Sequence, residues 1–159
     1  MPKDVILTPE GLEKLKEELG ELSTVRRREV ADRIKEAREF GDISENSEYD
    51  DAKNEQAMLE TRILQLEESL RSASVVHADE ISTDVAGVGT LVGLKWSGGG
   101  ADTFTIVGSA EADPSQKKLS NESPVGKALL GRKKGDDVTV NLPNGSTRKL
   151  KITKIDVGL

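Results

Sequence analysis

The sequence of 159 residues contains no cysteine and only four aromatic residues. The absence of cysteine excludes a disulfide framework, a thiol nucleophile and every metal centre that depends on cysteine ligands. An apolar run of about 18 residues, long enough to cross a membrane, is also missing, and the start of the chain is too charged for a secretory signal. We therefore expect a cytoplasmic protein without membrane attachment.

Positive charge is scarce as well. The chain holds 23 Lys and Arg against 29 Asp and Glu, a net charge of −6. Proteins that hold nucleic acid through a basic surface need clustered cations to displace the counterions of the phosphates. The composition therefore argues against independent high-affinity binding to nucleic acid. The acidity is confined to residues 1–77, which carry 12 basic and 19 acidic residues, whereas residues 78–159 carry 11 and 10.

Proline and glycine are unevenly distributed along the chain. Between residues 10 and 86 there is no proline and glycine occurs three times, whereas the chain from residue 87 onward is rich in glycine and has three prolines. Helices tolerate neither residue well, while turns between strands use both. The pattern predicts a helical domain over residues 1–77 and a small α+β domain over residues 78–159.

Two apolar stripes in the helical region predict an antiparallel coiled-coil hairpin. Thr8 and Pro9 are typical of a helix start, and the first stripe contains one slipped turn near Arg26. Only residues 40–46 separate the stripes, and a connection that short makes the helices antiparallel neighbours. The stripes are Leu12, Leu15, Leu19, Leu22, Val30, Ile34 and Ala37, and then Ala52, Leu59, Ile63, Leu66, Leu70 and Ala73.

The second half of the chain favours strands. Segments 89–96, 102–107, 138–142 and 148–155 are apolar, of strand length, and flanked by glycine-containing or proline-containing turns. Ser123 and Pro124 predict the start of a short helix that ends at Gly131. No catalytic constellation is visible in this half, and we expect Trp96 to belong to its core.

The connection between the two stripes concentrates acid. Asp42 and Glu45 lie on the turn itself, and carboxylate oxygens are ligands that suit Mg²⁺. Acids near a helix start also complement its dipole, and Ser47 with Asp50 fits a capping box. Spacing alone leaves the metal and the structural interpretation open. The carboxylates are those of Asp42, Glu45, Glu48, Asp50 and Asp51.

Three residues are expected to shape this turn. Gly41 permits a backbone conformation that other residues resist. Phe40 and Tyr49 are expected to pack on each other across it.

In the adjoining helix, Arg26 and its two arginine neighbours are expected to pair with Glu60 or Glu67 across the hairpin, with contact to RNA as the alternative.

Three segments resemble the bacterial GreA/GreB transcript cleavage factors, and the low basicity of the helices indicates the GreA-like branch. The resemblance implies an N-terminal antiparallel coiled coil and a C-terminal FKBP-like α+β domain that docks on RNA polymerase at the rim of its secondary channel. The segments are Thr8-Pro-Glu-Gly-Leu12, Ala37-Arg-Glu-Phe-Gly-Asp-Ile-Ser-Glu-Asn-Ser-Glu-Tyr49 and Ser123-Pro-Val-Gly-Lys-Ala-Leu-Leu-Gly131.

The same resemblance implies an accessory factor, not an enzyme, that stimulates the polymerase's own cleavage of backtracked RNA. Asp42 and Glu45 then assist catalysis and hold a Mg²⁺ shared with the polymerase; none is bound independently. Gly41, Asn46, Glu48 and Tyr49 support the turn, Arg38 and Lys53 contact the RNA 3′ end or the channel wall, and Ser123 and Pro124 take part in docking.

Two alternatives stay open beside this interpretation. Asp50 and Asp51 make the turn more acidic than is usual in the family, which is compatible with a channel-binding inhibitor that does not stimulate cleavage. Arg38 and Lys53 can equally be surface residues that pair with Glu48 and Glu39.

Overall fold

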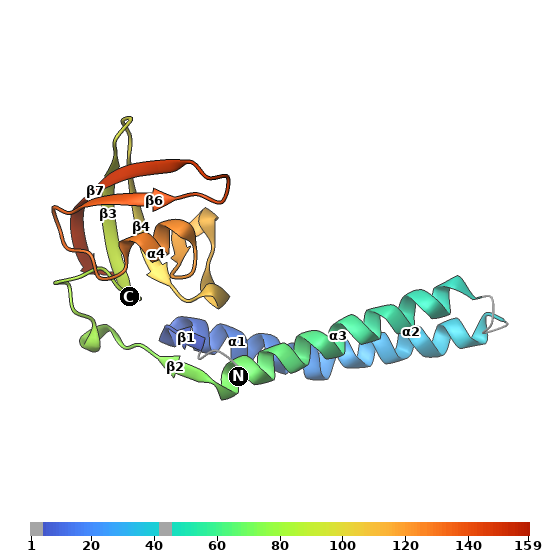
Figure 1. Cartoon of the computed structure of the whole chain (residues 1–159). Helices are drawn as coiled ribbons and strands as arrows, with labels where there is room; N and C mark the ends of the chain where they lie inside the picture. Colours follow the sequence, from blue (N-terminus) through green and yellow to red (C-terminus); the bar gives the residue numbers. More distant parts are fainter. Residues whose placement is uncertain (1–4, 42–45) are drawn as a thin grey trace. The chain divides into compact units, whose positions relative to one another are not determined.

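The computed structural model describes residues 5–41 and 46–159, and these form two compact units (Figure 1). The hairpin unit is Glu13–Ser72, and the globular unit joins the residues up to Leu12 with Ala73–Leu159. This division differs from the sequence-based boundary between residues 77 and 78. The first residues of the chain fold with the last ones, a long-range association that no local pattern announces.

Two nearly continuous helical rods form the hairpin (Figure 1). The first rod consists of α1 (Pro9–Glu21), a π-helical turn η1 (Leu22–Arg26) and α2 (Arg27–Glu39), and the second is α3 (Ser47–Arg71). Thr8 begins the first rod as expected, because its hydroxyl oxygen accepts a hydrogen bond from the Gly11 N–H at 3.1 Å. None of the described helices combines the length and apolarity needed to span a bilayer.

The predicted apolar seam is confirmed. Val30 and Ile34 of α2 pack with Ala52, Leu59 and Ile63 of α3, and Leu19, Leu22 and Tyr49 are partly buried against them. One assignment is wrong: Ala73 was placed in the second stripe, but α3 ends at Arg71 and Ala73 begins a strand. That residue leaves the helix because its segment pairs with the N-terminal strand.

The slipped turn of the first stripe is the π-helical turn η1. A π turn accommodates one extra residue within a helix, which moves the apolar face forward by one position. Carbonyls at this irregularity receive side-chain donors: the Ser23 hydroxyl donates to the Leu19 oxygen and the Thr24 hydroxyl to the Gly20 oxygen, each at 2.6 Å. The seam therefore stays continuous although the heptad pattern does not.

The globular unit contains a mixed five-stranded sheet and one short helix, α4 (Pro124–Leu129) (Figure 1). The strand order is β5-β4-β3-β7-β6; β5 runs parallel to β4 and the other neighbours are antiparallel. A separate parallel pair joins the N-terminal strand β1 (Val5–Leu7) to β2 (Ala73–Val75). The other bounds are β3 Thr90–Trp96, β4 Ala101–Val107, β5 Lys118–Ser120, β6 Asp137–Asn141 and β7 Thr147–Val157, with single 3₁₀ turns at Ala78–Glu80, Ser109–Glu111 and Pro114–Gln116.

Alternate residues of the sheet build the core of this unit, as the period of a strand requires. The four predicted strands and the predicted short helix are confirmed, and Gly131 ends that helix with φ = 78°. The strands β1, β2 and β5 were not predicted, because three residues are too few to show a period. The buried core residues are Ala86, Val92, Leu94, Ile106, Leu129, Val138, Val140, Leu150, Ile152 and Ile155.

The N-terminus of α1 is fastened inside the globular unit. The Glu111 carboxylate accepts hydrogen bonds from the Thr8 N–H at 2.8 Å and from the Thr8 hydroxyl at 2.5 Å, across 103 positions of sequence. An anion at a helix N-terminus also complements the helix dipole. Gly11 leaves room for this contact, because a Cβ at that position would lie 2.1 Å from the Glu111 side chain and would displace the carboxylate.

Candidate functional site at the hairpin tip

Residues 40–51, which comprise the connection between the two rods and the first residues of α3, are called the tip. Two of its acids, Asp42 and Glu45, lie outside the residues that the structure describes, so their metal-binding role stays a prediction. Within residues 5–41 and 46–159, no group of three or more acidic or histidine side chains is arranged to hold a metal ion. The geometry of the tip is therefore read from the residues on either side of the turn.

Asn46 joins the two rods at the tip. Its side-chain oxygen accepts a hydrogen bond from the Tyr49 N–H at 3.1 Å, which caps α3, and its side-chain nitrogen donates to the Ala37 carbonyl of α2 at 2.5 Å. The expectation that Ser47 caps the helix with Asp50 is wrong, because Ser47 is already the first helical residue. Asparagine caps helices as well as serine does, so the sequence allowed both registers.

The prediction for Gly41 is confirmed, and the prediction for Phe40 is wrong. Gly41 adopts φ = 141°, a conformation that favours glycine, as expected. Phe40 does not pack on Tyr49: its side chain is 85% exposed, whereas Tyr49 is partly buried against the seam. The ring of Phe40 falls beyond the last turn of α2, where no apolar partner is described.

The two cations assigned to the tip have different surroundings. The guanidinium of Arg38 lies 5.8 Å from the centre of the Tyr49 ring, a cation–π distance. The Lys53 ammonium donates to the Gln56 side chain at 3.0 Å. In the described part of the chain neither is paired with Glu39 or Glu48, and Glu48 instead lies 3.5 Å from Arg33.

Below the tip, arginines neutralise acids across the hairpin. Arg33 and Arg26 both hydrogen-bond the Glu55 carboxylate, and these bonds, chiefly that of Arg33, hold the pKa of Glu55 below its ordinary value while partial desolvation opposes them. Sequence reasoning missed Glu55 as a partner.

The expected pairing of the arginine run is confirmed at Arg27. Two parallel hydrogen bonds of 2.9 Å join its guanidinium to the Glu60 carboxylate and lower the pKa of Glu60. In contrast, Asp50 and Asp51 form no ion pair with any described residue. Asp50 and Asp51 therefore contribute uncompensated negative charge at the tip.

Ser123 and Pro124 stand at the start of α4 in the globular unit. The Ser123 hydroxyl accepts a hydrogen bond from the Gly126 N–H at 3.0 Å and donates to the Ser120 carbonyl at 2.7 Å, so it is the helix cap that the sequence predicts. Pro124 is exposed, as is Leu130 just beyond the helix. Capping explains Ser123 and leaves the docking role a prediction.

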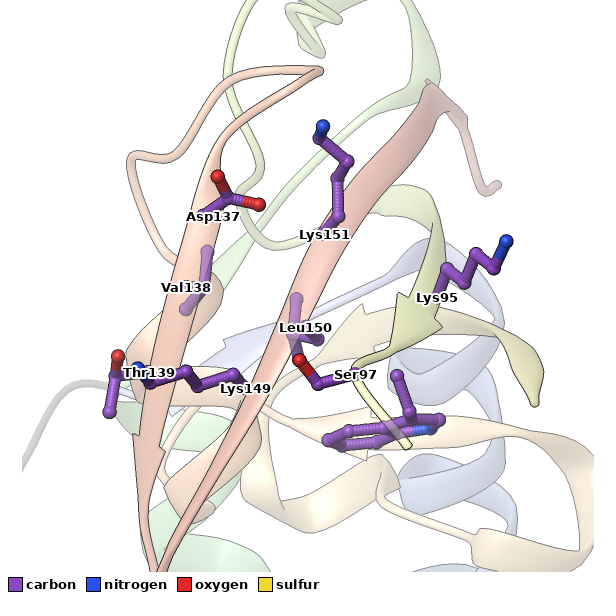
Figure 2. A pocket seen from close by; sticks show the side chains of 9 residues that line it. Lys95, Ser97, Asp137, Val138, Thr139, Lys149, Leu150 and Lys151 are labelled. Carbon is purple, nitrogen blue, oxygen red and sulfur yellow. The ribbon is translucent and has the colours of Figure 1, made fainter. Parts of the chain in front are cut away.

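A hollow of about 470 Å³ in the globular unit is lined by residues of β3, β6 and β7 (Figure 2). Lys95, Lys149 and Lys151 line it and form no ion pair with any described residue. Its lining includes no buried polar side chain, which is typical of a solvated sheet face.

Trp96, which also lines this hollow, was expected in the core and is only partly buried there. Its indole N–H donates a hydrogen bond to the Asp102 carboxylate at 2.8 Å, and the Arg148 guanidinium lies 3.9 Å from the centre of its ring. The assignment of Trp96 to the core is therefore confirmed in part.

Known proteins are similar to this chain in sequence along nearly its full length. The family described as transcription elongation factor, N-terminal, matches residues 5–75, and that described as transcription elongation factor, GreA/GreB, C-term, matches residues 81–157. Transcription elongation factor GreA of Acetivibrio thermocellus is 58% identical over 96% of both chains. That of Thermoanaerobacter pseudethanolicus is 55% identical over 98% of this chain and 99% of the relative.

A solved structure also aligns along nearly the full length. The crystal structure of GreA factor homolog 1 of Thermus thermophilus is 33% identical, with coverage of 97% of this chain and 99% of that one and a TM-score of 0.44.

Proposed function

This chain belongs to the GreA/GreB family of transcription elongation factors, and we propose that it acts by stimulating the RNA cleavage activity of RNA polymerase. The globular unit docks at the rim of the secondary channel and the hairpin tip enters it. A backtracked complex, whose RNA 3′ end is extruded into that channel, is then cut and resumes elongation. The observation that carries this proposal is the acidic tip at the end of a two-helix hairpin.

Asp42 and Glu45 are the residues that reach the polymerase active centre in this proposal. They offer oxygen ligands only, the donor set that Mg²⁺ prefers, and two carboxylates leave most of its shell for ligands from a partner. The donor chemistry therefore fits an ion shared with the polymerase better than one held by this chain alone. When bound, such an ion lowers the pKa of a coordinated water and stabilises negative charge on the phosphodiester.

The described residues of the tip connect the two rods. Asn46 ties the end of α2 to the start of α3, and Gly41 supplies the backbone conformation that the turn needs. Asp50 and Asp51 form no ion pair with a described residue, so they add their negative charge to that of Asp42 and Glu45 in attracting a metal. Arg38 and Lys53 then contact the extruded RNA or the channel wall.

Docking is assigned to the globular unit, whose sheet and crossing helix we take to be FKBP-like. Pro124 and Leu130 flank α4 and are exposed to solvent. Ser123 fixes the start of this helix through its two hydrogen bonds. A partner that recognises this surface holds the factor at the channel rim.

Cleavage of backtracked RNA by a stalled bacterial RNA polymerase tests the proposal. The wild-type factor with Mg²⁺ should release short 3′ fragments, and Asp42→Asn or Glu45→Gln should reduce the rate on the order of 100-fold, as expected for loss of a metal-site group. Both variants should still bind the polymerase and compete with the wild type. The matched control is Glu39→Gln, an exposed acid on the last turn of α2, which should cleave normally. Unchanged cleavage by the Asp42 and Glu45 variants would contradict the proposal.

A second candidate function is inhibition of polymerase without stimulated cleavage. The acids Asp50 and Asp51, which form no described ion pair, favour it because extra carboxylates at the tip compete for the same Mg²⁺. In the same assay this function predicts slower nucleotide addition and no fragments. If the factor stimulates cleavage, chelation of Mg²⁺ should abolish fragment release. If it inhibits the polymerase, added Mg²⁺ should relieve the slower nucleotide addition.

A further inference from the structure

Phe40 is the most exposed of the large apolar side chains described in the structure, at 85%. The others in the hairpin, Val25, Met58 and Leu64, lie along the helices and are less exposed. Exposing an aromatic ring forgoes the stabilisation that its burial would give. The fold of the hairpin makes no use of this ring, although its backbone position is tightly specified.

The attachment of Phe40 to the tip is firm. Its N–H donates to the Ala37 carbonyl at 3.3 Å, and the same carbonyl receives the Asn46 side chain at 2.5 Å. The next residue, Gly41, turns the chain away with φ = 141°. The ring is therefore presented from a fixed point at the end of α2, two positions before Asp42.

The charges around Phe40 restrict what it can meet. The tip is rich in carboxylates, and these repel the phosphates of RNA unless a metal ion lies between them. A nucleobase is uncharged and has a π-face, so an aromatic ring binds it without positive charge. Arg38, which is held over the Tyr49 ring, adds one cation at the same end of α2. An exposed aromatic ring is the kind of group on which a base of single-stranded nucleic acid stacks.

We propose that the Phe40 ring stacks on a base of the extruded RNA 3′ segment and positions that RNA over the tip carboxylates. This inference rests on the proposed function, since it needs RNA in the channel. Phe40 is a substrate-positioning residue: it holds the base, while Asp42 and Glu45 act at the phosphodiester. Stacking on any base is tolerated, so the contact does not select a sequence.

Fluorescence of 2-aminopurine placed in the extruded RNA segment tests the contact without requiring cleavage. Binding of the wild-type factor should quench the base, and so should the non-cleaving Asp42→Asn variant. Phe40→Ala should lose the quenching while still binding the polymerase, and Phe40→Trp should restore it. Met58→Ala, which removes a comparably exposed apolar side chain from the shaft, is the matched control and should quench normally. Full quenching by Phe40→Ala would overturn the proposal.

Cleavage rates supply the second measurement. Phe40→Ala should slow cleavage roughly tenfold, the usual effect of removing one base-stacking ring. On RNA whose extruded nucleotides are abasic, wild type and Phe40→Ala should cleave equally. An equal loss on both RNAs would overturn the proposal and indicate contact with the channel wall instead. A wild-type factor that quenches but does not cleave would refute the proposed function and leave the stacking contact supported.

Discussion

Asn46 is the residue through which the two rods of the hairpin are held together at the tip. It satisfies one donor at the start of α3 and one acceptor at the end of α2 with a single side chain. A serine or an aspartate can supply the first bond but not the second, because neither has a donor of that reach. The two hydrogen bonds together therefore explain why this position is asparagine, which helix capping alone does not.

We expect Asn46→Ala to destabilise the hairpin by about 1 kcal/mol, the usual cost of a lost cap, with a further loss from the unsatisfied Ala37 carbonyl. Thermal and denaturant unfolding followed by far-ultraviolet circular dichroism measures it. Asn46→Asp should fall between wild type and Asn46→Ala, because it keeps only the acceptor. Ser47→Ala is the control and should be close to neutral. A larger effect from Ser47 than from Asn46 would show that the cap is assigned to the wrong residue.

At the residue scale, the sequence predicted the backbone and capping roles of single residues correctly, but not which side chains pack on each other. Gly41 was identified from its backbone freedom, and Ser123 from its place before a proline. Phe40 was expected inside the turn because aromatic residues are usually buried, but the rods end before its ring finds a partner. Whether an aromatic ring is covered depends on where neighbouring elements stop, and sequence spacing does not give that.

The π-helical turn is the most informative single element of the hairpin. Leu22 and Val30 are eight residues apart, one more than a heptad, and both face the seam. A straight α-helix would carry one of the two away from α3. The extra residue is absorbed in η1, where Ser23 and Thr24 bond backbone carbonyls.

Deletion of Thr24 should convert η1 into a regular α-helical turn, because it restores a spacing of seven residues between the two parts of the seam. Thr24 is exposed and bonds only the Gly20 carbonyl, so its loss removes no core contact. We expect the hairpin to keep or slightly raise its melting temperature. Insertion of an alanine after Thr24 should lower it clearly, because the seam then loses its register. Equal destabilisation by the deletion and the insertion would argue against this account.

At the element scale, periodicity predicted every helix and strand that is long enough to repeat a pattern. The two rods and the four long strands follow from it, whereas α4 follows from the start signal Ser123-Pro124 and the stop at Gly131. The strands β1, β2 and β5 did not, since each has three residues and forms only because another segment pairs with it. The ion pairs of Glu55 with Arg26 and Arg33 were not predicted for a related reason. Which acid faces an arginine across the hairpin depends on the rotation of both rods about their axes.

At the scale of the whole molecule, the boundary between the two units follows the pairing of β1 with β2 and not the change in composition near residue 78. Residues 5–7 pair with residues 73–75, and Leu7 is fully buried. Glu111 caps α1, and a Cβ on Gly108 would lie 2.1 Å from the Ile6 carbonyl oxygen. The N-terminal strand is therefore an integral part of the globular unit.

Leu7→Ala should accordingly destabilise the globular unit by about 2–5 kcal/mol, the range for a leucine truncated in a core. Trp96 is the only tryptophan and lies in that unit, so its fluorescence reports this transition alone. Leu64→Ala, on an exposed position of the hairpin, is the control and should leave the Trp96 transition unchanged. A Trp96 transition that ignores Leu7→Ala would place the first strand with the hairpin instead.

The sequence by itself determined the family, the helical hairpin, the strand-rich second half and the acidic character of the tip. These depend on residue type, period and motif, which are local and survive without coordinates. Only the tertiary structure decided the pairing of β1 with β2, the capping of α1 by Glu111, the exposure of Phe40 and the choice of Asn46 as the joint between the rods. Each of these brings together groups whose distance in space is set by the packing of whole elements. The structure also decided which acids of the hairpin are neutralised: arginines pair with Glu55 and Glu60, whereas Asp50 and Asp51 at the tip form no ion pair with a described residue.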